Sequence, residues 1–125
     1  VILLHIEREL DLERSTHLRM MRRRLSDLWS SVNADLQRPW SVAELSSIAG
    51  MSPVHLNRTC HALGGTSTMR LVGFLRLDRA RELLMNTDYP VGLVADMVGY
   101  RDAFAFSTAF RKRFGVAPSR YRRAE

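Results

Sequence analysis

Apolar residues recur every three or four positions along most of this 125-residue chain, the spacing of one face of an α-helix. The longest such stripe predicts an amphipathic helix over residues 17–36; its members are Leu18, Met21, Leu25, Leu28, Val32 and Leu36. Leu3, Ile6 and Leu10 predict a shorter helix that ends before Ser15-Thr16. No segment alternates as a strand would, so we expect an all-α fold.

The stripe over residues 17–36 has two interpretations. It could form a dimeric coiled coil, although two and a half heptads are few for that purpose. We favour packing of this helix on the helical unit that follows it.

Capping side chains mark the boundaries of the later helices. Ser41 and Glu44 have the spacing of a capping box, which begins a short helix that Gly50 ends. Ser52-Pro53 then supplies an N-cap and a first helical residue, and Asp102 can cap a helix in the same way. The predicted helices cover residues 41–49, 53–63, 67–86, 91–98 and 103–113, with a final turn or helix from Pro118.

The chain contains the same plan twice, about fifty residues apart. Aligning Gly50 with Gly99, with one extra residue in the second turn, makes four further pairs. They are Leu56 with Phe106, Cys60 with Phe110, Gly65 with Gly115 and Leu71 with Tyr121. Each copy is a glycine turn between two short helices, and the helix over 67–86 connects the copies. Two such helix-turn-helix units on a basic chain predict a protein that reaches two places on one DNA duplex.

Charge and cysteine content narrow the class further. The net charge is +6; residues 1–15 carry −2, so the rest of the chain carries +8 and should attract polyanions. The single cysteine, Cys60, excludes an intrachain disulfide and favours a reducing compartment. The apolar runs are too short to span a bilayer, and VILLHI at the start lacks the features of a secretory signal. We therefore expect a cytoplasmic protein, and the initial Val1 suggests that residues precede it.

In the first copy, the outward residues of the predicted helix over 53–63 are candidates for base contacts in the major groove. They are Val54, His55, Asn57, Arg58 and His61, with Pro53 beside them. Arg58 suits guanine, Asn57 suits adenine, and Val54 suits a thymine methyl group. A phosphate contact or a salt bridge is the alternative for Arg58, and capping or a phosphate contact is favoured for His55.

In the second copy, the outward residues are small: Ala103, Ala105, Ser107 and Thr108. We expect weak base reading there, and phosphate contacts from Arg101, Arg111, Lys112 and Arg113. Ser52, Thr66 and Ser67, near helix starts, are further phosphate candidates; ordinary capping is the alternative and is favoured for Ser67. The hypothesis is an unequal pair, in which the first unit discriminates sequence and the second adds affinity.

Three other functions compete with this hypothesis. An enzyme is disfavoured because His5, His17, His55 and His61 lack metal-ligand spacing and no phosphate-binding glycine loop occurs. Cys60 is better explained as core filler than as a nucleophile. A sequence-tolerant architectural binder of DNA or RNA remains the alternative, and the acidic N-terminal helix could contact another domain or subunit.

Several motifs between Leu25 and Arg123 resemble the DNA-binding domain of AraC/XylS-type bacterial transcription regulators. The most specific are Gly99-Tyr100, Phe106-Ser107, Phe110-Arg111-Lys112, Phe114-Gly115-Val116-Ala117-Pro118 and Tyr121-Arg122. The run from Arg76 to Leu84 resembles the family's connecting helix. Ala49-Gly50-Met51-Ser52-Pro53 and His55-Leu56-Asn57-Arg58 resemble the first turn and recognition helix.

The resemblance implies seven helices, with the fourth bridging two units whose recognition helices enter successive major-groove segments of one DNA face. It also implies transcriptional activation, less often repression, no cofactor, RNA polymerase as a candidate partner, and a separate effector or dimerisation domain. The corresponding segments are 1–16 as a linker or last helix of that domain, 17–66 and 87–125 as the two units, and 67–86 as the connector. Departures are Cys60 for Phe, Thr68 for Pro, Leu71 for an aromatic residue and Thr108 for Arg. They suggest looser packing of the first unit and weaker readout by the second.

Overall fold

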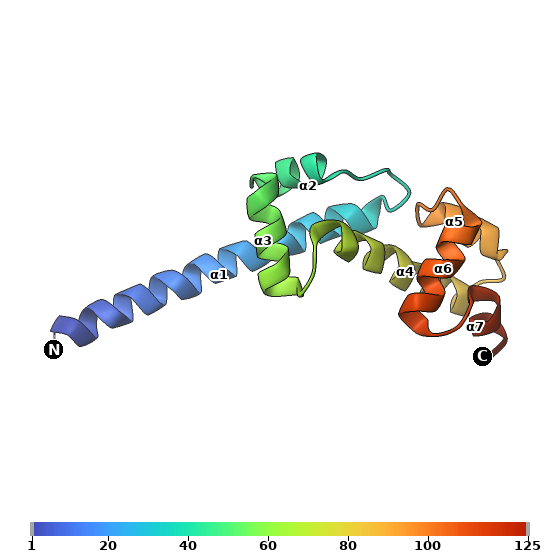
Figure 1. The fold of residues 1–125 in the computed structure, drawn as a ribbon. Coiled ribbons are helices and arrows are strands. Elements are labelled where there is room, and N and C mark those ends of the chain that lie inside the picture. The colour runs from blue at the N-terminus through green and yellow to red at the C-terminus, as the bar shows by residue number, and fades with distance from the viewer. Residues whose placement is uncertain (1, 125) are drawn as a thin grey trace.

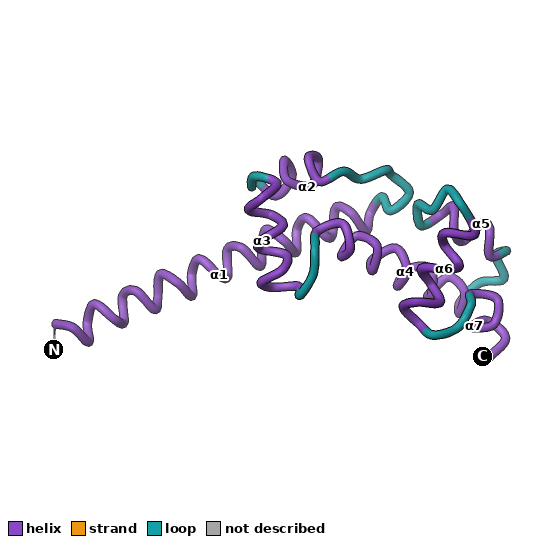
Figure 2. The backbone as a smooth tube through the Cα atoms, in the orientation of Figure 1, coloured by secondary structure: helices purple, strands orange, loops and turns teal. Residues whose placement is uncertain are grey.

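The computed structural model describes residues 2–124, and the side chains of residues 4–122. Within this range the chain forms seven helices and no strand (Figure 1). They are α1 (Ile2–Ala34), α2 (Val42–Ala49), α3 (Pro53–Gly64), α4 (Thr68–Asn86), α5 (Val91–Met97), α6 (Ala103–Phe114) and α7 (Pro118–Ala124). Loops and turns separate the helices (Figure 2). The all-α prediction and the two-unit arrangement are confirmed.

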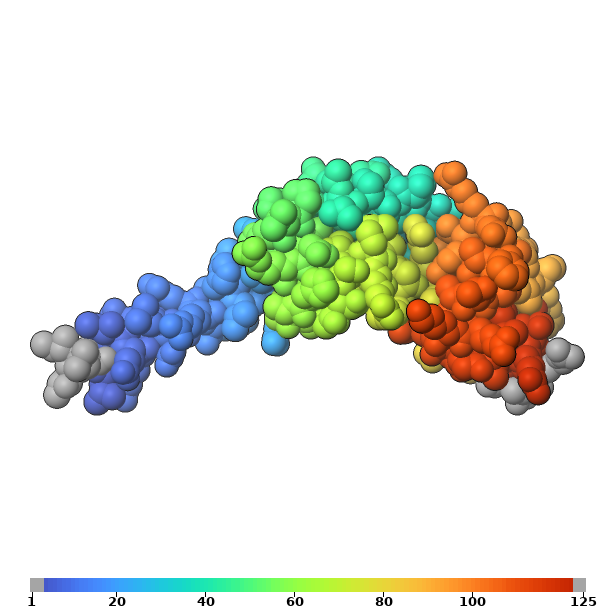
Figure 3. All heavy atoms as spheres, viewed as in Figure 1, coloured from blue at the N-terminus to red at the C-terminus, as the bar shows by residue number. Residues whose placement is uncertain are grey.

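Helix α1 runs without interruption through Ser15 and Thr16, so the predicted break there is wrong. Each of these residues costs less than about 0.7 kcal/mol in a helix interior, and no Gly or Pro lies within α1. The side chains of residues 4–20 are all exposed. This half of α1 extends away from the rest of the molecule (Figures 1 and 3).

The second half of α1 packs on the first helix-turn-helix unit, as predicted. Its apolar stripe is buried from Met21 onward, and Leu28 and Val32 are fully covered. One core joins these side chains to α2, α3 and the start of α4 through Leu45, Leu56, Cys60 and Val72. No helix in residues 2–124 has the length and apolar character needed to cross a bilayer.

A second core lies between the far half of α4 and helices α5, α6 and α7. It contains Leu77, Ala80, Leu83, Leu84, Val94, Ala95, Val98, Phe106 and Phe110. Aromatic rings fill much of it: Phe110 lies 5.8 Å from Phe106, 4.7 Å from Phe114 and 5.6 Å from Tyr121 between ring centroids. Because α4 contributes to both cores, it is the predicted connecting helix.

The four glycines that the repeat aligns all adopt left-handed backbone. Their φ values are 68° at Gly50, 78° at Gly65, 95° at Gly99 and 85° at Gly115. Gly65 and Gly115 end α3 and α6 as caps whose amides donate to carbonyls four residues back. The repeat therefore holds at the level of backbone conformation, which the sequence alignment alone could not test.

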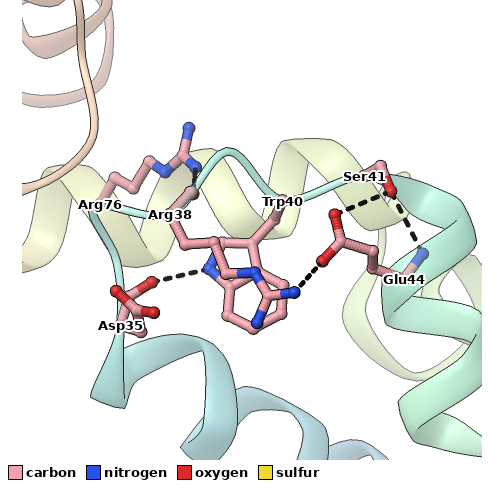
Figure 4. A network of polar contacts seen from close by, with 6 residues as sticks. All are labelled: Asp35, Arg38, Trp40, Ser41, Glu44 and Arg76. Carbon is pink, nitrogen blue, oxygen red and sulfur yellow. Dashed lines mark hydrogen bonds and ion pairs between the residues drawn. The ribbon is translucent and has the colours of Figure 1, made fainter.

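The loop between α1 and α2 is held by side chains at both of its ends (Figure 4). The Trp40 indole N–H donates to the Asp35 carbonyl at 2.8 Å, and the Arg38 guanidinium lies 4.7 Å from the Trp40 ring centroid. The Ser41 hydroxyl accepts from the Glu44 amide, which is half of the predicted capping box. The other half does not form, because the Glu44 carboxylate contacts Arg38 and the Ser41 hydroxyl instead.

Candidate nucleic-acid interface

Helix α3 presents one exposed face beginning at its first turn. The Ser52 hydroxyl accepts from the His55 amide at 3.1 Å, and Pro53 is the first helical residue. Leu56 and Cys60 are fully buried, whereas Val54, His55, Arg58 and His61 are exposed. These four predicted base-contact residues thus lie on one accessible surface, and Arg58 makes no ion pair with any described side chain.

Asn57 makes a contact within the fold that the sequence did not predict. Its side-chain oxygen accepts from the Thr68 amide at 3.1 Å and lies 3.4 Å from the Thr68 hydroxyl, so it joins α3 to the start of α4. A bidentate pair with adenine needs that oxygen. The Asn57 oxygen is thus used within the fold, and a base contact by Asn57 stays a prediction.

The internal repeat explains why this link exists only in the first unit. Thr68 aligns with Pro118, which has no amide hydrogen to donate, and Asn57 aligns with Ser107. Thr68 stands where the resembled family usually has proline. This departure was the one feature of the sequence that could have indicated a hydrogen bond from the Thr68 amide.

Helix α6 presents the equivalent surface of the second unit. The Asp102 carboxylate accepts from the Phe104 amide at 2.9 Å, which confirms the predicted cap. Ala103, Ala105 and Thr108 are exposed as expected, and Ser107 is half-buried. Phe104 was not among the predicted site residues, yet its side chain is 79% exposed. The repeat aligns Phe104 with Val54, and this alignment could have predicted that the Phe104 side chain is exposed.

The basic candidates of the second unit fall into two groups. Arg101, Arg111 and Lys112 are exposed, and none forms an ion pair with a described side chain. Arg113 instead makes a two-pronged contact with Asp78 on α4, with Nε 3.0 Å from Oδ1 and Nη2 3.1 Å from Oδ2. It also stacks 4.1 Å from the Phe74 ring centroid. Arg113 thus has a structural use between α6 and α4, and its phosphate contact stays a prediction.

The serines near the helix starts act as caps. The Ser52 hydroxyl is used within α3, and the Ser67 hydroxyl accepts from the Arg70 amide at 3.4 Å. This is the alternative favoured for Ser67. Thr66 is half-buried beside it.

Cys60 lies in the core of the first unit. Cys60 is fully buried, and burial raises the pKa of its thiol while the contact with the Thr68 hydroxyl opposes that shift. A raised pKa leaves little thiolate at neutral pH, so the side chain behaves as core filler. The described residues contain no group of three or more His, Cys, Asp or Glu placed to bind a metal ion.

Both α4 and the turn of the second unit contact the loop that follows α1. The Arg76 guanidinium on α4 donates to the Arg38 carbonyl at 2.9 Å, and burial lowers its pKa. A Cβ atom on Gly99 would lie 2.5 Å from the Leu36 carbonyl oxygen and 3.1 Å from Arg76 Nε. The turn of the second unit therefore rests against the first unit with no space for a side chain.

Both recognition segments lie on one face of the molecule. Figure 3 shows α3 in green and α6 in orange-red on the face toward the viewer, with α4 between them. A groove of about 390 Å³ lies between α4 and α6, with Arg70 and Lys112 among its lining residues. Two glycine-turn helix pairs, each with an exposed start to its second helix, define a DNA-binding domain with two helix-turn-helix units.

Comparison with known proteins agrees with this class. A family model described as a helix-turn-helix domain matches residues 45–124. The chain is 37% identical over 98 residues to the uncharacterized HTH-type transcriptional regulator YidL of Escherichia coli, covering 78% of this chain and 33% of that protein. It spans about a third of the length of the curated relatives it matches.

Two solved structures have the same architecture. An AraC-type transcriptional regulator from Chromobacterium violaceum aligns with a TM-score of 0.77 at 26% identity, over 82% of this chain and 91% of that one. The DNA-binding domain of the transcriptional factor AdpA, solved with a target DNA, aligns with a TM-score of 0.75 at 29% identity, over 80% and 90% of the two chains. The chain belongs to the AraC family of helix-turn-helix transcription regulators.

Proposed function

We propose that this chain binds double-stranded DNA in a sequence-specific manner, with α3 and α6 in successive segments of the major groove. The observation that supports this most directly is the exposure of both helix starts on one face, on either side of α4. The AdpA domain, which has the same architecture, was solved with its target DNA.

The exposed side chains suggest which unit discriminates between bases and which mainly contacts phosphates. In α3, Arg58 can address guanine, and Val54, His55 and His61 border the same surface. In α6, Ala103, Ala105 and Thr108 offer few hydrogen bonds, so discrimination by hydrogen bonding rests mainly on α3. Arg101, Arg111 and Lys112 supply phosphate contacts, with Ser52, Thr66 and Ser67 adding contacts near helix starts.

In the cell, we propose that the protein regulates transcription by binding at promoters and activates it through contact with RNA polymerase. Several relatives are described as activators, among them RclR of Escherichia coli. Because this chain matches only about a third of its relatives' length, we place effector binding or dimerisation in a separate domain. The chain itself acts as a binding module rather than as an enzyme.

In vitro selection from random duplexes, followed by competition at physiological salt, tests this function. The expected result is a selected duplex preferred over random DNA by about 10³-fold or more. It should contain two elements about one helical turn apart, around 10 base pairs. If the affinities for selected and random duplexes were nearly equal, the chain would be a sequence-tolerant architectural binder. A selected duplex with a single short element would show that only one unit engages the DNA.

A further inference from the structure

Phe104 is the most exposed large apolar side chain among residues 4–122, at 79%. The neighbouring rings of the second unit are used in its core: Phe106 and Phe110 are fully buried. The aromatic contacts of the described residues join Tyr100, Phe106, Phe110, Phe114 and Tyr121, and Phe104 takes no part in them. The ring therefore adds little to the packing of its own unit.

The repeat places Phe104 opposite Val54, which is 68% exposed. Each is the second residue of its recognition helix, following Pro53 in α3 and Ala103 in α6. Each lies two residues after the N-cap of its helix. Both units thus carry an exposed apolar side chain at the same position, in the turn that leads a recognition helix into the major groove.

The major groove offers one apolar group to such a side chain, the C5 methyl of thymine. Around Phe104 the neighbours Ala103 and Ala105 cannot form side-chain hydrogen bonds, so the contact available to this turn is apolar. Arg101 and Arg111, both exposed near the ends of this surface, can hold the flanking phosphates. The second unit is therefore not limited to phosphate contacts and shape.

Building on the proposed function, we propose that Val54 and Phe104 each pack on a thymine methyl group, one in each half of the binding site. The two thymines lie about one helical turn apart, around 10 base pairs. Phe104 is then the main specificity-determining residue of the second unit, through a contact that needs no hydrogen bond.

The test replaces each thymine of the selected duplex, one at a time, with deoxyuridine, which lacks only the methyl group. We expect a loss of affinity of about fourfold at one position in each half-site. Phe104→Ala should weaken binding to the unmodified duplex by about tenfold and abolish the effect of deoxyuridine in the second half-site alone. Val54→Ala should abolish it in the first half-site alone.

Leu12→Ala is the matched control, because Leu12 is 64% exposed on the projecting part of α1. It should leave both deoxyuridine effects unchanged. Phe104→Ser, a second variant at the same exposed position, should reproduce the Phe104→Ala result, and the deoxyuridine effect retained in the first half-site shows that both variants are folded.

Distinct results overturn the two proposals. Selection that yields no preferred duplex overturns the proposed function and this inference with it. A preferred duplex whose second half-site shows no deoxyuridine effect, or an effect that persists in Phe104→Ala, overturns this inference and leaves the proposed function in place.

Discussion

At the scale of single residues, ion pairs and hydrogen bonds, rather than exposure alone, distinguish the side chains free to meet DNA from those that the fold uses. Arg58 and Lys112 are exposed and have no described ion-pair partner, whereas Arg113 is held by Asp78. Formal charge alone treats all three alike. The distinction matters because an arginine committed to a carboxylate is not available to neutralise a phosphate.

Arg58→Ala and Lys112→Ala should weaken DNA binding in different ways. Arg58→Ala should cost about 1–3 kcal/mol on the selected duplex and relax preference at one base pair. Lys112→Ala should weaken all duplexes alike and reduce the salt slope by about one. Affinity for selected and random duplexes over a range of salt concentrations measures both. Interchanged results would contradict the assigned roles.

The link between Asn57 and Thr68 predicts a loss of stability without a change in base preference. Asn57→Ala leaves the Thr68 amide without its partner and should lower the free energy of unfolding by about 1 kcal/mol. Denaturant unfolding measures this loss, and selection of duplexes measures the preference. A variant that kept its stability but lost preference at an adenine would restore the base-reading role.

Thr68→Pro provides the matched background for that prediction. Proline suits the first helical position and removes the amide hydrogen that Asn57 satisfies. In this background Asn57→Ala should cost less than it does in the original chain. Equal costs in the two backgrounds would show that Asn57 stabilises the fold through another contact.

At the scale of elements, local spacing predicted the helix caps but not the contacts between helices. Ser52, Ser67 and Asp102 cap helices that begin within three residues of them, so their roles follow from short spacing. The Asn57–Thr68 and Asp78–Arg113 contacts join residues 11 and 35 positions apart. Nothing in local spacing selects such partners, so the sequence did not predict these uses of Asn57 and Arg113 within the fold.

The length of α1 shows that a local signal can also mislead, because the boundary predicted at Ser15-Thr16 does not exist. Ser15-Thr16 looked like a boundary because both residues favour helix ends, but their cost within a helix is small. The apolar stripe gave the buried half correctly because burial follows the three-four spacing from Met21 onward. The spacing of Leu3, Ile6 and Leu10 predicted a helix in the preceding half too, but it did not show that the two helices join or that the first stays exposed.

Substitutions along α1 should therefore differ sharply in effect. Leu28→Ala removes a fully buried side chain and should lower the free energy of unfolding by about 2–5 kcal/mol. Leu12→Ala, at a position 64% exposed, should change it by less than about 0.5 kcal/mol. Denaturant unfolding of both variants checks the contrast. A large loss from Leu12→Ala would show that the projecting half of α1 packs on another surface.

At the scale of the whole molecule, simultaneous binding depends on how the two units are held relative to each other. Reading two half-sites requires α3 and α6 to keep one spacing and one orientation. Besides α4 itself, the structure offers the close approach of Gly99 to the Leu36 carbonyl, which leaves no room for a Cβ atom, and the hydrogen bond from Arg76 to the Arg38 carbonyl. These contacts join the second unit and the connector to the loop that follows α1.

Gly99→Ala tests this arrangement. The new methyl group would lie 2.5 Å from the Leu36 oxygen, so the second unit must shift away from the first. The left-handed backbone at Gly99, with φ 95°, adds strain of about 1 kcal/mol or more for any other residue. We expect affinity for the two-element duplex to fall by about tenfold or more, while affinity for a duplex with only the first element changes little, since that element is bound by α3 alone.

Gly50→Ala is the control that separates backbone strain from displacement of the units. Gly50 has φ 68°, and a Cβ atom added there would meet no other atom within 4 Å, so the variant carries strain of the same kind without the collision. It should lower the free energy of unfolding yet keep the affinity ratio between two-element and one-element duplexes, measured under conditions where both variants are folded. If Gly99→Ala also kept that ratio, the contact at Leu36 would not set the spacing of the recognition helices, and α4 alone would hold them in register.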